Sequence, residues 1–478
     1  MLRLLGFFAV FLLSFGHSAF ANSEVTLRDV VEAVLTKHLV IEKRDAQVQG
    51  GTAQLQQAGG EFDWNIFAEA GYKQPRVPGS QNGLLTTETT TNDVFSVSLG
   101  AQKRFRNGIA IEPGVSISRN YSKDASDVLA DSVTVGHFKI SVPMLQGFGE
   151  KSTSALERAA RQSFHASELD GDRDIAETLV ASVVLYWQNV AIKRNIDAMR
   201  RVDEVAKTTS ETVRKLSEQG ELPSLEYQRS NADLNLRRLR IEKILLTWNS
   251  TRRELGKFLN GNEITNELPT AVGEFPVEIP EVNGASTEQL IQLALDKRRD
   301  LRALERQLDA KRSEYIKIKD GLLPKLDLNI DIDRVSLNYA QSIGNNVAKG
   351  RKSAQHVEIR RLELQIKQLR QDVSDEVSSI VQRVRGNRAN YMRAKEAYNI
   401  LAQITQHTRE QVEQGAISRG EYLAALDELS NVEHIINEAS VNHVIALAQL
   451  RLATGTLPIG SKNIETTVNA LITVPNGG

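Results

Sequence analysis

The 478-residue chain has no cysteine, little proline and few aromatic residues, and each shortage excludes a class of protein. Without cysteine there is no disulfide, no thiolate nucleophile, no cysteine-ligated metal and no lipid attached to an N-terminal cysteine. Only 11 prolines and 5% aromatic residues, beside 25% charged residues, argue against a series of compact enzyme cores. The formal net charge is −1, so no electrostatic field favours nucleic acid or an anionic membrane surface.

The first 21 residues have the pattern of a secretion signal. Arg3 precedes an apolar stretch from Leu4 to Phe15, and Ala19-Phe20-Ala21 is a small-x-small cleavage pattern. The apolar stretch is shorter than the roughly 20 residues that a spanning helix needs, so cleavage is favoured over a retained anchor. No later segment is predicted to span a membrane as a helix. Export then leaves the periplasm, the exterior or the outer membrane as the destination.

Helical and strand periodicities alternate along the mature chain. Residues 26–58 indicate a helix, and four stretches between residues 62 and 143 alternate apolar and polar residues, as half-buried strands do. A long helix is predicted from about 150 to 218, with apolar residues every three or four positions like a coiled-coil seam. A helix of that length would extend roughly 100 Å, and a shorter helix follows at 223–260.

The same order of elements returns after a linker that contains three prolines, residues 262–286. The predicted divisions are a signal peptide at 1–21, a first repeat at 22–261, the linker, a second repeat at 287–456 and a tail at 457–478. The second repeat has a helix, a strand region at 324–340, a long helix at 352–414 and a final helix to about 454. Its strand region offers one clear strand where the first repeat offers four, so the number of strands per chain stays open.

Two similar segments, "EQGELPSLEY" from Glu218 and "EQGAISRGEY" from Glu413, each follow a long helix. Gly220 and Gly415 can adopt the left-handed conformation that reverses a chain, and Ser224 and Ser418 can cap the next helix. The two segments therefore predict two helical hairpin tips, near residues 220 and 415.

These duplicated halves, together with "SVPMLQGFGEKSTSALERA" and "LLPKLDLNIDI", resemble the TolC-like outer-membrane efflux family. The resemblance implies a mainly α fold with a β part. Long helical hairpins would form a periplasmic α-barrel, and amphipathic strands from a homotrimer would close one outer-membrane β-barrel. A few amphipathic strands cannot satisfy their own edges in lipid, which independently favours closure with further copies.

The resemblance implies a passive channel component of a tripartite efflux or type I secretion system in a Gram-negative outer membrane, extending into the periplasm. It would be no enzyme and would have no cofactor and no nucleic-acid partner. Its partners would be copies of itself, outer-membrane lipid, a periplasmic adaptor (membrane fusion protein) and an inner-membrane pump. The alternative is a periplasmic coiled-coil adaptor or scaffold protein without its own pore, which would also have long helical hairpins.

The resemblance also assigns candidate site residues. Carboxylates just inside the periplasmic mouth would form a cation-favouring gate, and by position after the tip glycine Glu421 matches the first of them. The next family acid falls on Ala424, Asp427 lies one turn further along, and Glu226 is the first-half counterpart of Glu421. The candidate adaptor-docking tips are Gly220, Glu221, Leu222, Gly415, Ala416, Ile417 and Ser418. The candidate membrane-interface aromatics are Trp64, Tyr72, Phe95, Phe105 and Phe138.

Other interpretations of these residues remain open. Glu421 can be an exposed first-turn acid that complements the helix dipole, and the tip residues can pack against one another. "GFGEKST" from Gly147 lacks the uninterrupted Gly-Lys-Ser/Thr of a phosphate loop and is predicted to be a strand-to-helix turn. The histidines show no ligand-like spacing, so no metal site is predicted. No catalytic constellation stands out.

Overall fold

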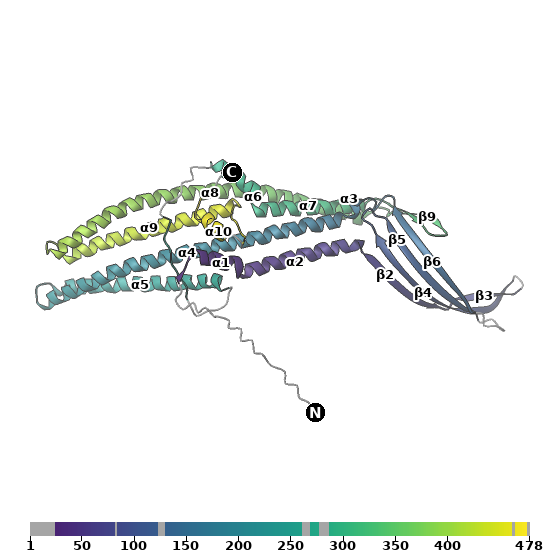
Figure 1. The fold of residues 1–478 in the computed structure, drawn as a ribbon, viewed down its shortest axis with the longest axis horizontal. Helices are drawn as coiled ribbons and strands as arrows, with labels where there is room; N and C mark the ends of the chain where they lie inside the picture. The colour runs from purple at the N-terminus through teal and green to yellow at the C-terminus, as the bar shows by residue number, and fades with distance from the viewer. Residues whose placement is uncertain are drawn as a thin grey trace, which may run out of the picture. The chain divides into compact units, whose positions relative to one another are not determined.

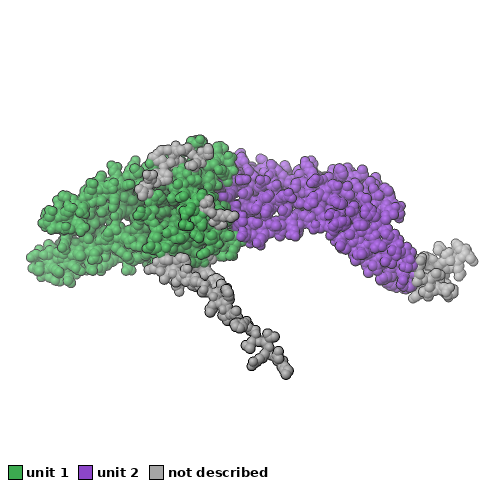
Figure 2. All heavy atoms as spheres, in the orientation of Figure 1, with its two compact units in different colours: residues 1–42, 174–297, 373–478 green, residues 43–173, 298–372 purple. Residues whose placement is uncertain are grey.

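A computed structural model describes residues 24–81, 84–122, 130–260, 268–276, 286–460 and 464–475. The expected signal peptide and parts of the expected linker lie outside these residues. The chain divides into two compact units, shown in different colours in Figure 2. The first unit comprises 1–42, 174–297 and 373–478, and the second comprises 43–173 and 298–372. The fold is mainly α with a β part, as predicted.

An antiparallel sheet dominates the second unit (Figure 1). The strands follow one another in space in the order β2-β4-β5-β6-β8-β9, and β3 pairs with the far part of β4. Their bounds are β2 Trp64–Lys73, β3 Arg76–Gln81, β4 Leu84–Arg104, β5 Ala110–Ser122, β6 Ala130–Pro143, β8 Lys325–Ile330 and β9 Val335–Ala340. The four stretches predicted in the first half lie in β2, β4, β5 and β6. β3 and the early part of β4 were not predicted.

The two faces of this sheet differ in chemistry because the alternation of each strand is kept in register with its neighbours. Residues directly opposite one another form apolar rows on one face, such as Ala68, Leu99, Val115 and Gly136. On the other face the strands carry mainly small and polar side chains, including Ser96, Ser98, Gly100, Gly114, Ser116 and Ser118. A Cβ on residue 100 would lie 2.4 Å from the Phe67 ring, so this glycine makes room for an aromatic side chain from β2.

The sheet joins helices through a network of charged side chains. Arg106, in the turn between β4 and β5, donates two hydrogen bonds of 2.8 and 3.0 Å to the Glu157 carboxylate at the start of α4 (Ala155–Glu218). This arginine lowers the pKa of Glu157 below its ordinary value. The segment "GFGEKST" forms a strand-to-helix turn, as predicted, with Gly147 and Gly149 at positive φ before the short helix α3 (Glu150–Thr153).

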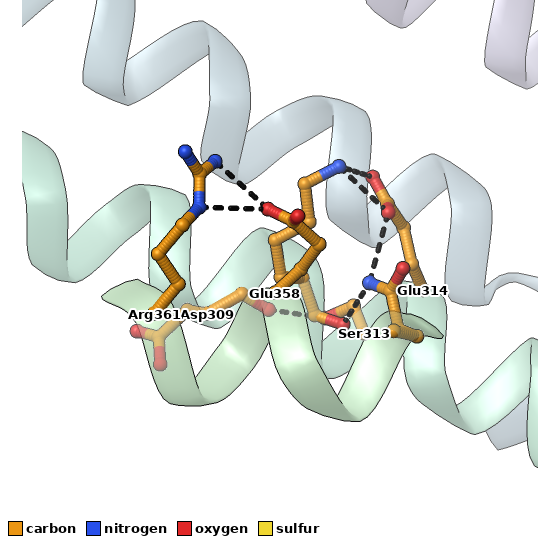
Figure 3. Close-up of polar contacts among 7 residues, drawn as sticks. Asp309, Ser313, Glu314, Glu358 and Arg361 are labelled. Carbon is orange, nitrogen blue, oxygen red and sulfur yellow. Dashed lines mark hydrogen bonds and ion pairs between the residues drawn. The ribbon is translucent and has the colours of Figure 1, made fainter. Parts of the chain in front are cut away.

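Helices α7 (Arg299–Asp320) and α8 (Asn346–Glu413) flank the β8–β9 hairpin and are joined by polar contacts (Figure 3). The side-chain amide of Gln355 donates to the Lys311 carbonyl at 2.9 Å and to Glu314 Oε2 at 3.1 Å. Within each helix, Lys311 pairs with Glu314 and Arg361 pairs with Glu358. The two ends of the hairpin therefore emerge from one fastened helix pair.

Two helical hairpins form most of the first unit. α4 turns into α5 (Ser224–Leu259) and α8 turns into α9 (Arg419–Ala453). Gly220 has φ 79° and Gly415 has φ 72°, which confirms the predicted left-handed turns. The Ser418 hydroxyl accepts a hydrogen bond from the Glu421 amide and caps α9, as predicted. The capping role predicted for Ser224 is wrong, because α5 is preceded by Pro223, and Ser224 is already its first helical residue.

The core of the first unit lies where several helices meet. Residues 175–190 of α4 pack with α1 (Leu27–Thr36), α10 (Ile464–Leu471) and the last turns of α5 and α9. Part of the expected linker joins this core: β7 (Thr270–Ala271) pairs with β1 (Glu24–Val25), and the Tyr186 hydroxyl donates to the Val272 carbonyl at 2.7 Å. α6 (Thr287–Lys297) follows the linker.

One helix, α4, has a window long and apolar enough to cross a membrane, with mean hydropathy 1.4, so the expectation that no later segment meets these criteria is wrong. In this window 61% of the residues are buried inside the chain. Its apolar residues, including Leu179, Val183 and Trp187, form the core described above. They are therefore explained by packing within the unit.

The single helix expected over residues 26–58 is two helices, α1 and α2 (Leu39–Gly59), and the short helix η1 (Gly60–Phe62) follows them. The break falls at Lys37 and His38, where the His38 ring accepts a hydrogen bond from the Val40 amide at 3.2 Å and stacks on Phe258. Helical periodicity on both sides hides such a break in sequence, because the packing against α5 that fixes it is distant in the chain.

A buried histidine predicts that the first unit loses stability in acid. His443 on α9 is only 1% exposed, and burial lowers its pKa to about 4, although the nearby Val384 carbonyl of α8 acts in the opposite direction. In the unfolded chain this group binds a proton near pH 6.5. Its contribution to stability is therefore complete above that pH and is lost as pH falls toward 4, by at most on the order of 3 kcal/mol.

We expect His443→Leu to flatten the fall in thermal stability between pH 7 and pH 5, measured by circular dichroism. The exposed His407→Gln serves as the matched control and should leave the wild-type slope unchanged. Equal slopes in wild type and His443→Leu would show that His443 does not cause the acid sensitivity.

Candidate functional site

Polar contacts join the two hairpins near their tips. The Arg419 guanidinium donates to Thr212 Oγ1 at 3.1 Å, and Arg201 pairs with Glu433 at 2.5 Å. Further from the tips, the side-chain amide of Asn437 donates to Asn195 Oδ1 at 2.8 Å. These contacts all connect α4 with α9. They fasten the two hairpins through hydrogen bonds and an ion pair, beside buried apolar residues of α4 such as Val202 and Ala206.

A further contact between the hairpins, from α5 to α9, is the Arg237 cluster, which consists of Arg237, Asp233 and Asp427. Arg237 of α5 makes a bidentate ion pair with Asp427 of α9, with Nη2 2.6 Å from Oδ2, and its Nε lies 2.7 Å from Asp233 Oδ2. The Arg237 side chain is 14% exposed. The hydrogen bond to Asp427 raises the pKa of Arg237 above its ordinary value, and burial opposes this effect. The cluster fastens the first hairpin to the second.

The three predicted gate acids occupy different environments. Asp427 is committed to the Arg237 cluster. Glu421 lies in the first turn of α9, is exposed, and accepts a hydrogen bond from the Ser418 hydroxyl at 3.3 Å. Glu226 lies in the first turn of α5 and pairs with Arg229 at 3.2 Å. Of the three gate candidates, Glu421 is therefore the one for which the structure of the described residues gives no ion pair with a basic side chain.

The predicted docking residues form the two turns between the paired helices. Gly220 and Glu221 are exposed in the first turn, and Gly415, Ala416 and Ser418 are exposed in the second. Leu222 and Ile417 are half-buried, so each tip covers part of its own apolar residue. Leu225, the second residue of α5, is an apolar side chain that is 52% exposed.

The predicted interface aromatics lie toward the two ends of the apolar face of the sheet. Tyr72 and Phe95 are directly opposite each other at the end far from the helices. Trp64 lies at the near end, where Lys103 Nζ is 5.4 Å from the Trp64 ring and 5.9 Å from the Phe105 ring. Phe138 is one row further from the helices than Trp64. All five aromatics are exposed.

Eight residues separate Trp64 from Tyr72 along β2. At about 3.4 Å per residue this is roughly 27 Å along the strand, which a tilt of about 35–45° reduces to a height of roughly 20 Å, close to the apolar band of about 25 Å of a membrane barrel. Ile66 is 74% exposed between the two aromatic ends. The sheet thus presents an apolar face of membrane height.

A cavity of about 470 Å³ lies between α4, α8 and α9 in the first unit. Charged and aromatic side chains line it, including Arg194, Arg201, Lys395, Glu433, Tyr391 and Tyr398. No group of three or more potential metal-ligating side chains was found among the described residues. The polar groups around this cavity include the ion pair and the amide contact that join α4 and α9.

No protein-family model and no curated protein matches the sequence. Solved structures match nearly the whole chain. The Campylobacter jejuni CmeC outer membrane channel is 15% identical, with 93% of this chain and 89% of CmeC covered at a TM-score of 0.68. The Vibrio cholerae outer membrane protein VceC is 13% identical, with coverage of 90% and 96% and a TM-score of 0.64. The Neisseria gonorrhoeae MtrE outer membrane channel is 15% identical, with coverage of 91% and 90% and a TM-score of 0.59.

The chain has the TolC-like channel fold. At these identities the likeness establishes the fold alone, and the function must be argued from the residues. The similar proteins named here are outer-membrane proteins, and CmeC and MtrE are described as channels.

The sequence interpretation of this TolC-like fold named Asp427 but missed Arg237. One signal was present, since Asp233 and Arg237 are four positions apart on a predicted helix, the spacing of an intrahelical ion pair. The contact with Asp427 could not be found in this way, because 190 positions separate the two residues in the chain.

We expect Arg237→Ala to speed amide hydrogen exchange in the first turns of α9, because Asp427 and Asp233 would lose their shared cation. The free energy of local opening should fall by on the order of 1 to 2 kcal/mol. The effect is limited because Asp427 is 37% exposed and solvent screens its charge. The matched control is Arg238→Ala, whose side chain is 49% exposed and lies 4.0 Å from Asp203. Equal exchange rates in both variants would contradict a fastening role for the cluster.

Proposed function

We propose that this protein is the outer-membrane channel component of a tripartite efflux or type I secretion system. Three copies would close their sheets into one barrel in the outer membrane of a Gram-negative bacterium, and their hairpins would surround a passage through the periplasm. The protein would be a passive conduit that catalyses no reaction and needs no cofactor. Two similar halves of each chain would contribute hairpins of matching design.

The apolar face of the sheet carries this proposal. An exposed face of membrane height, bounded by aromatics, suits lipid and would be a liability in water. The path of strands ends at β2 and β9, so the sheet is open at both ends. Unpaired backbone groups cannot remain in the hydrocarbon of a bilayer, so further copies must supply their partners.

The helices of the first unit favour the same assembly. Contacts connect α5 with both α4 and α9, α4 with α9, and α9 with α8. No hydrogen bond or ion pair that the structure gives for the described residues connects α5 with α8, so these two are taken as the end helices of one copy. Both end helices expose large apolar side chains, namely Leu225, Leu236, Leu239 and Leu246 on α5 and Met392, Ile400 and Ile404 on α8. Pairing α5 of one copy with α8 of the next would cover both stripes and close a ring.

The mouth of the passage would lie at the hairpin tips. The symmetry of the assembly would place one Glu421 from each copy in a ring of carboxylates that favours cations. The Arg237 cluster would hold the two hairpins of each copy together near this ring. The exposed turn residues would dock a periplasmic adaptor that connects the channel to an inner-membrane pump. Glu226, already paired with Arg229, would have a smaller part in selectivity.

The test is single-channel conductance of the purified mature protein in planar lipid bilayers. We expect discrete cation-preferring openings, and Glu421→Ala should reduce the cation preference or enlarge the opening because one ring of charge is removed. Glu410→Ala, which removes an exposed acid from α8 of the same hairpin, is the matched control and should behave as wild type.

The outcomes separate the parts of the proposal. Unchanged selectivity in Glu421→Ala would remove the gate assignment and leave the conduit standing. Failure of the wild-type protein to insert or conduct would overturn the conduit, and the soluble scaffold without a pore would then be the better explanation.

A further inference from the structure

The sheet of the second unit changes in width along its height. At its end near the helices, the pairings place six residues in one row: Trp64, Lys103, Ile111, Ile140, Ile330 and Val335. Eight residues further along β2, the row consists of Tyr72, Phe95, Arg119 and Ser132 alone. The sheet therefore has six strands beside the helices and four across the apolar band.

Strand length explains the change. β2, β4, β5 and β6 have 10, 21, 13 and 14 residues, whereas β8 and β9 have 6 each. A tilted strand needs about 9 to 11 residues to cross the hydrocarbon of a bilayer. The first four strands meet this requirement, and the β8–β9 hairpin does not.

Several contacts hold the β8–β9 hairpin at the end of the sheet near the helices. Its turn closes with a hydrogen bond of 2.8 Å from the Asp331 amide to the Arg334 carbonyl. β8 pairs with β6 only over residues 140–143, where the Ser141 hydroxyl donates to Asn329 Oδ1 at 2.5 Å. After β9 the chain turns back through Gly344, at φ 81°, and Asn345, whose side-chain amide donates to the Leu322 carbonyl at 3.5 Å. Figure 1 shows β9 beside the part of the sheet nearest the helices.

This arrangement leaves most of one edge of β6 available. In the described part of the sheet, the edge of residues 132–139 that faces away from β5 has no strand partner, because β8 joins β6 below it. The outer edge of β2, residues 64–73, is also unpaired. Both edges cross the apolar band, where an unpaired edge is most costly.

We infer that the first half of each chain supplies all the membrane-spanning strands, four per copy, and that β6 of one copy pairs with β2 of the next. The inference rests on the proposed membrane channel and identifies which edges join its copies. β2, β4, β5 and β6 alternate in direction, so β6 and the next copy's β2 meet antiparallel, as a closed membrane barrel requires. The β8–β9 hairpin forms a rim at the periplasmic side and crosses no lipid.

Disulfide trapping can test this seam without interference, because the natural chain contains no cysteine. Gly136→Cys or Thr134→Cys on β6 is combined with Ile66→Cys, Ala68→Cys or Ala70→Cys on β2, so that different seam registers are sampled. All these positions lie on the same face of the sheet, and the structure leaves room for a Cβ at Gly136. Within one copy, three strand spacings, roughly 14 Å, separate β2 from β6, so a bridge can form only between copies.

The matched control joins the alternative edge. Leu337→Cys on β9 is combined with the same three β2 substitutions, since Leu337 is exposed on the same face. Each variant is isolated from outer membranes, oxidised and examined on a denaturing gel without reductant. We expect covalent multimers from at least one β6–β2 pair and none from the β9–β2 pairs.

Covalent multimers from the β9–β2 pairs alone would overturn the inference and indicate a wall of six strands per copy. Absence of bridges from every pair, in protein that reaches the outer membrane and conducts, would also overturn it. Absence of the wild-type protein from the outer-membrane fraction would overturn the proposed function itself, and fractionation reveals this before any bridge is scored.

Discussion

The unpaired edges of an apolar sheet are the constraint on which the rest of the structure depends. The exposed face from Trp64 to Tyr72 suits lipid, but lipid offers no partner for the backbone groups of β2 and β6. One chain therefore cannot complete its own membrane structure. The proposed association into a ring would meet this requirement, and the same association would cover the exposed apolar side chains of α5 and α8 in the helical unit.

The contacts between the two helical hairpins include hydrogen bonds and ion pairs, unlike the apolar face of the sheet. Pairs such as Arg201 with Glu433, and the Arg237 cluster, join α4 and α5 to α9 through charges and hydrogen bonds. The core around Leu179 and Trp187, by contrast, is apolar and closely packed. The unit therefore combines ion pairs and hydrogen bonds between the hairpins with an apolar core further along the same helices.

Periodicity predicted much of this fold because each helix and strand shows its own repeat. The apolar seam of the long helix at about 150–218 and the alternation along β2 needed no distant information, and Gly220 and Gly415 mark their turns by chemistry alone. The break at His38, the early part of β4 and the partner of Asp427 depend on contacts with residues far away in the chain, so no local pattern revealed them. The gate and docking roles remain predictions, since they concern the assembled protein.

The central claim is that the sheet is completed by copies of the same chain within a membrane. Native mass spectrometry of the mature protein, released from detergent micelles or lipid nanodiscs, tests this claim most directly. The account predicts one species with the mass of three chains, and no stable protein in buffer without detergent. A monomer that stays soluble and folded without detergent would contradict it, because its sheet edges would then need no partner.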